Sequence, residues 1–272
     1  MGKCGEGYCQ ICGEYKVLSF EHVPPRGAYN DTPVAAIPMP IDSVASLASE
    51  LDGPPIPGYV SNKGSGTCTL CTDCNNFTGG SYGGYFVDAV KQIYQAVYSK
   101  KISVVFKDNR LQIPLHDIVP ARILKQIIAM FASIYSSSGK LFAEDHRELS
   151  DYLLSLDAQG WAGEHAFFMY FQKSGYARLI SNVYVTKEEP SEELLCKIDS
   201  AINTGSNTIS EFAFGFLGYI WARGDSIAIV KSSSYRFLDI TDWRKEQEKR
   251  DLILSLPSLT TFPPQLPMTY AL

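Results

Sequence analysis

The chain has 272 residues, of which 45% are hydrophobic and 19% charged, and its formal net charge is −5. This length allows one large domain or two small ones with a sizeable core. No apolar run is long enough to span a bilayer and the first residues form no apolar signal core, so we expect a cytoplasmic protein without a membrane segment. Within residues 1–80 four basic residues stand against eight acidic ones, which counts against strong non-specific affinity for nucleic acid.

The N-terminal part combines a cysteine-rich turn, a short strand and a helix. Residues 16–20 read as a strand, and residues 24–66 as a long Pro-, Gly- and Ser-rich insertion with one short helix at 43–51. Thr72 and Asp73 mark the expected start of a helix. The glycine-rich residues 79–84 indicate a flexible joint, after which apolar residues at helical spacing predict a helix over 85–100.

The remainder mixes helices and strands, so the sequence predicts an α+β protein with a boundary between a module at 1–99 and an α+β domain at 100–272. Helices are expected at 121–135, where Pro120 stands near the start, at 144–156 and in a charged stretch at 243–256. Strands are expected at 102–106, 111–115, 166–171, 177–185, 214–221 and 226–230.

Cysteines are concentrated at the N-terminus, where six of the seven lie within the first 74 residues. In a chain without a secretory signal, this clustering favours metal binding over disulfides. Two CxxC pairs, separated by 58 residues, have the spacing of a closed tetrahedral site for structural Zn²⁺. The expected ligands are Cys9, Cys12, Cys71 and Cys74.

Two further cysteines leave this assignment open. Cys68 can replace Cys71 as a ligand or stand aside, and Cys4 and Cys68 can hold a second ion only together with other ligands. We favour Cys71 and Cys74 because they directly precede Asn75 at the expected helix start.

The motifs around these cysteines are spaced like those of a known family. The acid–histidine pair Glu21 and His22 follows the first CxxC pair, and the second pair runs into Asn75 and Asn76. In this order, residues 8–85 resemble the zinc-containing branch of the HNH endonucleases, which have the ββα-metal fold. The whole chain also resembles bacterial proteins with an HNH-like N-terminal region.

The resemblance implies a hairpin with the acid–histidine pair and a helix that supplies an asparagine, clamped together by zinc. His22 is then the general base, since its ordinary pKa of about 6.5 suits neutral pH. Glu21 and Asn75 are the expected oxygen ligands of a catalytic Mg²⁺ or Mn²⁺, with Asn76 as the fallback ligand. Arg26 is expected to bind a substrate phosphate.

The family also carries a middle asparagine that braces the histidine loop, and Asn62 is the nearby candidate in this chain. The implied activity is metal-dependent hydrolysis of DNA phosphodiesters, in host defence or in mobile elements. The alternatives are a non-catalytic zinc module that binds nucleic acid or protein, and a purely structural zinc-stapled domain. The other histidines are expected to have structural or surface roles: His116, His146 and His165.

Overall fold

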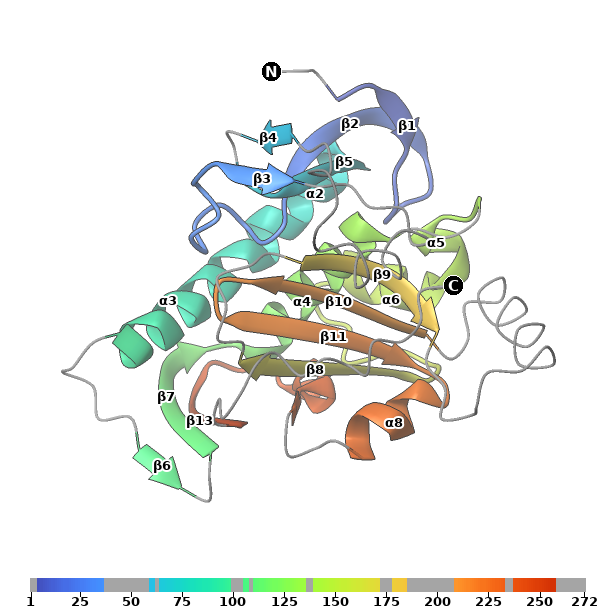
Figure 1. Cartoon of the computed structure of the whole chain (residues 1–272). Coiled ribbons are helices and arrows are strands. Elements are labelled where there is room, and N and C mark those ends of the chain that lie inside the picture. Colours follow the sequence, from blue (N-terminus) through green and yellow to red (C-terminus); the bar gives the residue numbers. More distant parts are fainter. Residues whose placement is uncertain are drawn as a thin grey trace, which may run out of the picture.

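The computed structural model describes most of the chain as a set of packed sheets and helices (Figure 1). None of the helices in the described part of the chain has the length and apolar content needed to cross a bilayer. The predicted helix at 43–51, Asn62, Cys196 and residues 102–104 of a predicted strand lie outside the described residues. The described residues are 4–36, 59–61, 64–98, 105–107, 110–135, 139–171, 178–184, 208–232 and 237–257.

The N-terminal cysteines lie on a small antiparallel sheet with the strand order β1-β2-β5. Its strands are β1 (Glu6–Tyr8), β2 (Tyr15–His22) and β5 (Gly66–Cys71). The central strand β2 is longer than predicted and ends on the acid–histidine pair, and its pairing with β5 shifts register between Ser19 and Glu21. A separate two-stranded pair, β3 (Val34–Ala36) and β4 (Tyr59–Ser61), lies within the insertion.

Three helical segments follow β5 without a break: α2 (Thr72–Thr78), the π-helical turn η1 (Gly79–Gly83) and α3 (Gly84–Tyr98). The expected flexible joint is therefore wrong. Tyr82 in this turn is fully buried, and its hydroxyl donates to the carbonyl of Leu153 at 2.5 Å, which fixes the turn against the rest of the molecule.

The second half is built on a five-stranded antiparallel sheet with the order β12-β8-β11-β10-β9 (Figure 1). Alternate residues of β8 point to opposite faces, as strand geometry requires. Phe167 and Met169 join the main core together with helix α4 (Pro120–Ile134), whereas Phe168 joins a smaller core with Val230 of helix α8 (Ser226–Ser232). The strands are β8 (His165–Phe171), β9 (Arg178–Tyr184), β10 (Thr208–Phe214), β11 (Leu217–Arg223) and β12 (Leu238–Asp239).

Helix α4 is buried on nearly all sides, and α6 and η2 are among the elements that pack against it. A third sheet has the order β13-β7-β6. Its strands and the neighbouring helical segments are β6 (Val105–Lys107), β7 (Arg110–Ile118), β13 (Arg250–Pro257), α5 (Phe142–Asp145), α6 (Arg147–Leu154) and the 3-10 helix η2 (Thr241–Lys245).

The chain is thus α+β, as predicted. One buried core includes Cys9 and Ile11 of the N-terminal part together with Phe142 and Trp221 of the second part. The domain boundary after residue 99 stays a prediction, since residues 99–104 lie outside the described part of the chain.

Four predicted elements differ from the structure. Residues 226–230 form the first turns of α8 instead of a strand, and the charged helix predicted at 243–256 is replaced by η2 and strand β13. The strand predicted at 214–221 is a hairpin, whose turn at Gly215 separates β10 from β11. The helix predicted at 144–156 is interrupted at His146, which separates α5 from α6.

Candidate metal centre and catalytic site

The first cysteine pair lies on a tight turn between β1 and β2. The turn closes through Gly13, whose amide donates to the carbonyl of Cys9 at 2.9 Å and whose φ of 74° suits a residue without a side chain. Gln10 fixes this turn from both sides. Its amide donates to Thr69 on β5, and its side-chain oxygen accepts from the amide of Phe142 at the start of α5 at 2.7 Å.

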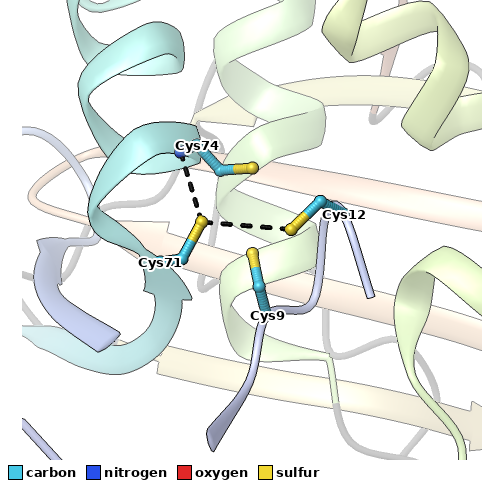
Figure 2. Close-up of side chains that lie close together, drawn as sticks. All are labelled: Cys9, Cys12, Cys71 and Cys74. Atoms are coloured by element: carbon cyan, nitrogen blue, oxygen red, sulfur yellow. Dashed lines mark hydrogen bonds between the residues drawn. The ribbon is translucent and has the colours of Figure 1, made fainter. Parts of the chain in front are cut away.

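The second cysteine pair lies where β5 passes into α2. Helix α2 begins at Thr72, as predicted, and Cys71 is its N-cap, whose sulfur accepts from the amide of Cys74 at 3.5 Å. The strand end and the first helical turn therefore present both sulfurs on the side of the first pair (Figure 2).

The four sulfurs converge on one point, as Figure 2 shows. They all lie within 4.8 Å of one another, and the Sγ atoms of Cys12 and Cys71 are 3.9 Å apart. A zinc tetrahedron with Zn–S bonds of about 2.3 Å has S···S edges of about 3.8 Å. The group can therefore bind a metal such as zinc, and Cys71 is the cysteine of β5 that belongs to it.

The proton affinities of these thiols depend on one another. A hydrogen bond from the Cys74 thiol lowers the pKa of Cys9 to about 4, and the same bond raises the pKa of Cys74. Burial raises the pKa of Cys12 to about 11. A cation held by all four sulfurs therefore displaces the protons of Cys12 and Cys74.

The other two N-terminal cysteines form a disulfide between Cys4 and Cys68, with Cα atoms 5.6 Å apart. The preference for metal binding over disulfides is therefore wrong for this pair, which takes no part in the four-cysteine group. The bond links the segment before β1 to β5, on the other side of β2 in the sheet.

Glu21 and His22 end β2 and face different environments. Glu21 is only 7% exposed, burial raises its pKa to about 7, and its carboxyl has no hydrogen-bond or ion-pair partner among the described residues. His22 is half-buried, and its ring packs edge-on against Phe20 at a centroid distance of 5.0 Å. Alternation along a strand accounts for this difference between neighbours.

Asn75 links α2 back to β2. Its amide nitrogen donates to Ser19 Oγ at 2.9 Å and to the carbonyl of Phe20 at 3.2 Å. Its Oδ1 accepts no hydrogen bond from the described residues, whereas Asn76 is exposed. Arg26 is also exposed and forms no ion pair within the described part of the chain.

The asparagine that braces the histidine loop in the structure is Asn30, which the sequence analysis missed. Its side-chain nitrogen donates to Pro24 at 2.6 Å and to Ser65 at 2.7 Å, and its Oδ1 accepts from the Ser65 amide at 2.7 Å. Gly64 is required beside it, because a Cβ there would lie 2.4 Å from Asn30 Oδ1. Asn30 is fully buried, so the loop after His22 is held in one position.

A second group with metal-ligand chemistry lies in the other half of the molecule, at His146, Glu148 and His165. His146 and His165 are two of the histidines for which the sequence predicted a structural or surface role. His165 Nε2 is 2.5 Å from Glu148 Oε1, while its Nδ1 accepts from Trp221 Nε1 at 3.2 Å. The Arg223 guanidinium donates to His146 Nε2 at 2.5 Å.

These contacts fix both rings in a state that does not suit a metal. Indole and guanidinium nitrogens only donate, so they occupy the acceptor nitrogen of each ring and leave a proton on the other nitrogen. Burial, followed by the charges of Arg223 and His165, lowers the pKa of His146 to about 2. The group is therefore a satisfied hydrogen-bond network. Its structural role agrees with the expectation for His146 and His165.

Comparison of the chain with family models, with curated proteins and with solved structures gives no match. The family resemblance therefore rests on the sequence motifs alone.

Proposed function

We propose that the chain is a metal-dependent endonuclease of the HNH type that hydrolyses phosphodiester bonds of DNA. The observation that carries this proposal is that Asn75 of α2 donates two hydrogen bonds to β2, one to Ser19 and one to Phe20. These bonds connect the helix that starts at the four-cysteine group with the strand that ends on Glu21 and His22. A strand pair followed by a zinc-clamped helix is the arrangement that the resemblance implies.

In this proposal Cys9, Cys12, Cys71 and Cys74 hold a structural zinc ion that keeps the helix against the hairpin. The donor chemistry at the strand end suits a hard divalent cation, because the Glu21 carboxyl and Asn75 Oδ1 are oxygen atoms without hydrogen-bond partners in the described part of the chain. Bound there, Mg²⁺ or Mn²⁺ supplies charge stabilisation for the phosphate and the leaving oxygen.

The protein groups then have distinct tasks. His22 takes the proton of the attacking water, and Asn30 keeps the loop behind it in one position. Arg26, exposed on the same loop, binds a non-bridging phosphate oxygen. The leaving group is a 3′-oxygen, so the products carry a 3′-hydroxyl and a 5′-phosphate, as the resemblance implies.

A second candidate is a non-catalytic zinc module that binds nucleic acid or protein. One observation favours a protein partner: Lys16, a basic residue next to the metal group, is already paired with Glu14 at 2.6 Å and with Asp73 at 3.1 Å. Its charge is therefore not available to a nucleic-acid phosphate. Under this alternative His22 contributes nothing to activity.

The test compares cleavage of supercoiled plasmid by the full chain with Mg²⁺ or Mn²⁺ and by the variants His22→Ala and His116→Ala. His116 is an exposed histidine paired with Asp251, so its removal is a matched control. We expect at least ~100-fold slower cleavage for His22→Ala, with zinc content unchanged, and wild-type rates for His116→Ala. Equal cleavage by all three proteins would refute the proposal, and binding without cleavage would support the zinc module.

A further inference from the structure

The Cys4–Cys68 disulfide has a defined position relative to the metal group. Cys4 lies five residues before Cys9, and Cys68 lies three residues before Cys71, so each half of the disulfide directly precedes one CxxC pair. The bond joins the segment just before β1 to β5, and β1 and β5 are the two outer strands of the sheet. It therefore ties together the two chain segments that supply the four sulfurs.

Metal binding at this group has to close a long loop. Between Cys12 and Cys71 the chain runs through 58 residues, and ordering such a loop costs conformational entropy. A disulfide that closes nearly the same loop removes most of this entropy from the open state beforehand. The second CxxC pair then meets the first at a high effective concentration.

Non-covalent contacts also hold the first CxxC turn near β5, since β2 pairs with β5 and the amide of Gln10 donates to Thr69. The segment before the turn has fewer contacts: strand β1 has three residues and pairs with β2, and one further backbone bond, from the amide of Leu18 to the carbonyl of Gly5, extends the pairing toward Cys4. The disulfide is the covalent link between this segment and β5, and it adds to the contacts that hold the turn.

We propose that the Cys4–Cys68 disulfide is a redox-sensitive clamp on the four-cysteine metal site, which binds zinc tightly when the disulfide is intact and more weakly when it is reduced. The inference rests on the metal-binding part of the proposed function and not on catalysis. By linkage, bound zinc favours the oxidised form of the pair to the same extent.

The reduction step involves a dithiol of the kind that reduces proteins in cells. One thiolate of the dithiol attacks the sulfur of Cys68, which is exposed, so that a mixed disulfide forms and Cys4 leaves as a thiolate. The second thiol of the dithiol displaces Cys68. The dithiol ends as a disulfide, its two hydrogens reside on Cys4 and Cys68, and two electrons have passed to the protein.

The four metal ligands are free thiols, so a reducing dithiol has no disulfide to break among them. The Cys4–Cys68 bond is the disulfide that it reduces, and the exposed sulfur of Cys68 gives it access. In a reducing compartment the clamp is open, and in an oxidising one it is closed.

The test measures zinc affinity of the full chain by competition with a chromophoric chelator, without any cleavage assay. Wild-type protein is compared before and after reduction with a phosphine, which is removed without air, and the double variant Cys4→Ser/Cys68→Ser is measured beside it. Cys196→Ser is the control for loss of an unrelated thiol. Alkylation and mass spectrometry report the state of Cys4 and Cys68 in each sample.

We expect the zinc dissociation constant to rise at least about tenfold on reduction and in the double variant, and to stay at the wild-type value in oxidised Cys196→Ser. Equal affinities in the oxidised, reduced and double-variant proteins would overturn the proposal, as would free thiols at Cys4 and Cys68 in the air-exposed, zinc-loaded protein. Reduced wild-type protein keeps the test valid if the double variant does not fold. A protein that binds zinc in this redox-dependent way but cuts no plasmid would support the clamp and refute the nuclease.

Discussion

Among the residues that the structure describes, two groups of side chains bring three or more potential metal-ligand atoms within 4.8 Å of one another, and the two groups differ in the hydrogen bonds that these atoms already make. In the four-cysteine cluster, Cys9, Cys12, Cys71 and Cys74, the sulfurs have mainly one another and the amide of Cys74 as partners. Because the thiols contact one another, each changes the proton affinity of its neighbours. Binding of a dication to the four sulfurs releases the protons that remain on them.

In the cluster of His146, Glu148 and His165, every acceptor nitrogen of the rings already has a donor. Trp221 donates to one ring and Arg223 to the other, and His165 is bonded to Glu148. A cation would have to displace these donors and lie near the buried guanidinium. The comparison teaches that proximity of ligand atoms identifies a metal site only where the hydrogen bonds around them leave lone pairs available.

The largest expected effect comes from breaking the four-cysteine cluster. Cys71→Ser should reduce the zinc content from one ion per chain to none and lower the apparent free energy of unfolding by several kcal/mol, because Cys9, Cys71 and Ile11 belong to the same buried core as Phe142. Elemental analysis after dialysis and thermal melts measure both quantities.

Cys196→Ser should leave zinc content and melting temperature unchanged, and a strong chelator should reduce the melting temperature of the wild type toward that of Cys71→Ser. A Cys71→Ser protein with one bound zinc ion and unchanged melting would remove the distinction between the two clusters.

The next largest effect concerns the cluster of His146, Glu148 and His165. Arg223 is 3% exposed and donates to His146 and to Thr208, so Arg223→Met leaves buried acceptors without a donor. We expect a loss of about 3 kcal/mol in urea-induced unfolding, with zinc content still one ion per chain.

Arg147→Met is the matched control, because Arg147 pairs with Asp151 on an exposed face at 80% side-chain exposure and such pairs contribute less than about 1 kcal/mol. If Arg223→Met were no less stable than Arg147→Met, the network would carry no structural role. A second zinc ion bound to wild-type protein would equally contradict the assignment.

The sequence was informative where a signal is local. Apolar residues at helical spacing predicted α3 to within two residues at each end, because a helix with one buried face repeats at 3.6 residues. The helix with Pro120 near its start was predicted equally closely and is α4. The two CxxC pairs likewise predicted the four cysteines that converge, since two such turns suit one tetrahedral ion.

Short apolar runs were ambiguous. In α8 only Ser226 and Val230 are buried, four residues apart, which is helical spacing that a five-residue window does not separate from a strand. In β13 the buried residues are Leu254 and Leu256, and pairing with β7 fixes the strand although charged residues precede it. Tertiary contacts decided both cases.

The parts of the candidate site that the sequence did not reveal depend on long-range contacts. Asn30 lies in a Pro- and Gly-rich stretch and meets Ser65 only when the insertion folds back. Arg223 and His146 are 77 residues apart, and Cys4 and Cys68 are 64 apart. The one local signal was the placement of Cys4 and Cys68 at similar offsets before the two CxxC pairs.

The smallest expected effect concerns the acid sensitivity of the satisfied network. The pKa of His146 is about 2 in the folded protein and about 6.5 in the unfolded chain, so its contribution to stability is complete above pH 6.5 and is lost as pH falls from 6.5 toward 2. The loss amounts to about 1.4 kcal/mol per pH unit well below pH 6.5, and to about 1 kcal/mol between pH 6.5 and 5.5.

His146→Gln keeps an oxygen that can accept from Arg223 but removes the titration. The variant should be less stable than wild type at pH 7.5, and this gap should narrow by about 1.4 kcal/mol at pH 5.5 in urea titrations. Because both proteins carry the same four-cysteine cluster, the pH dependence of zinc binding cancels in the difference. A gap that stays constant with pH would mean that His146 is protonated in the folded state, and its Nε2 would then not accept from Arg223.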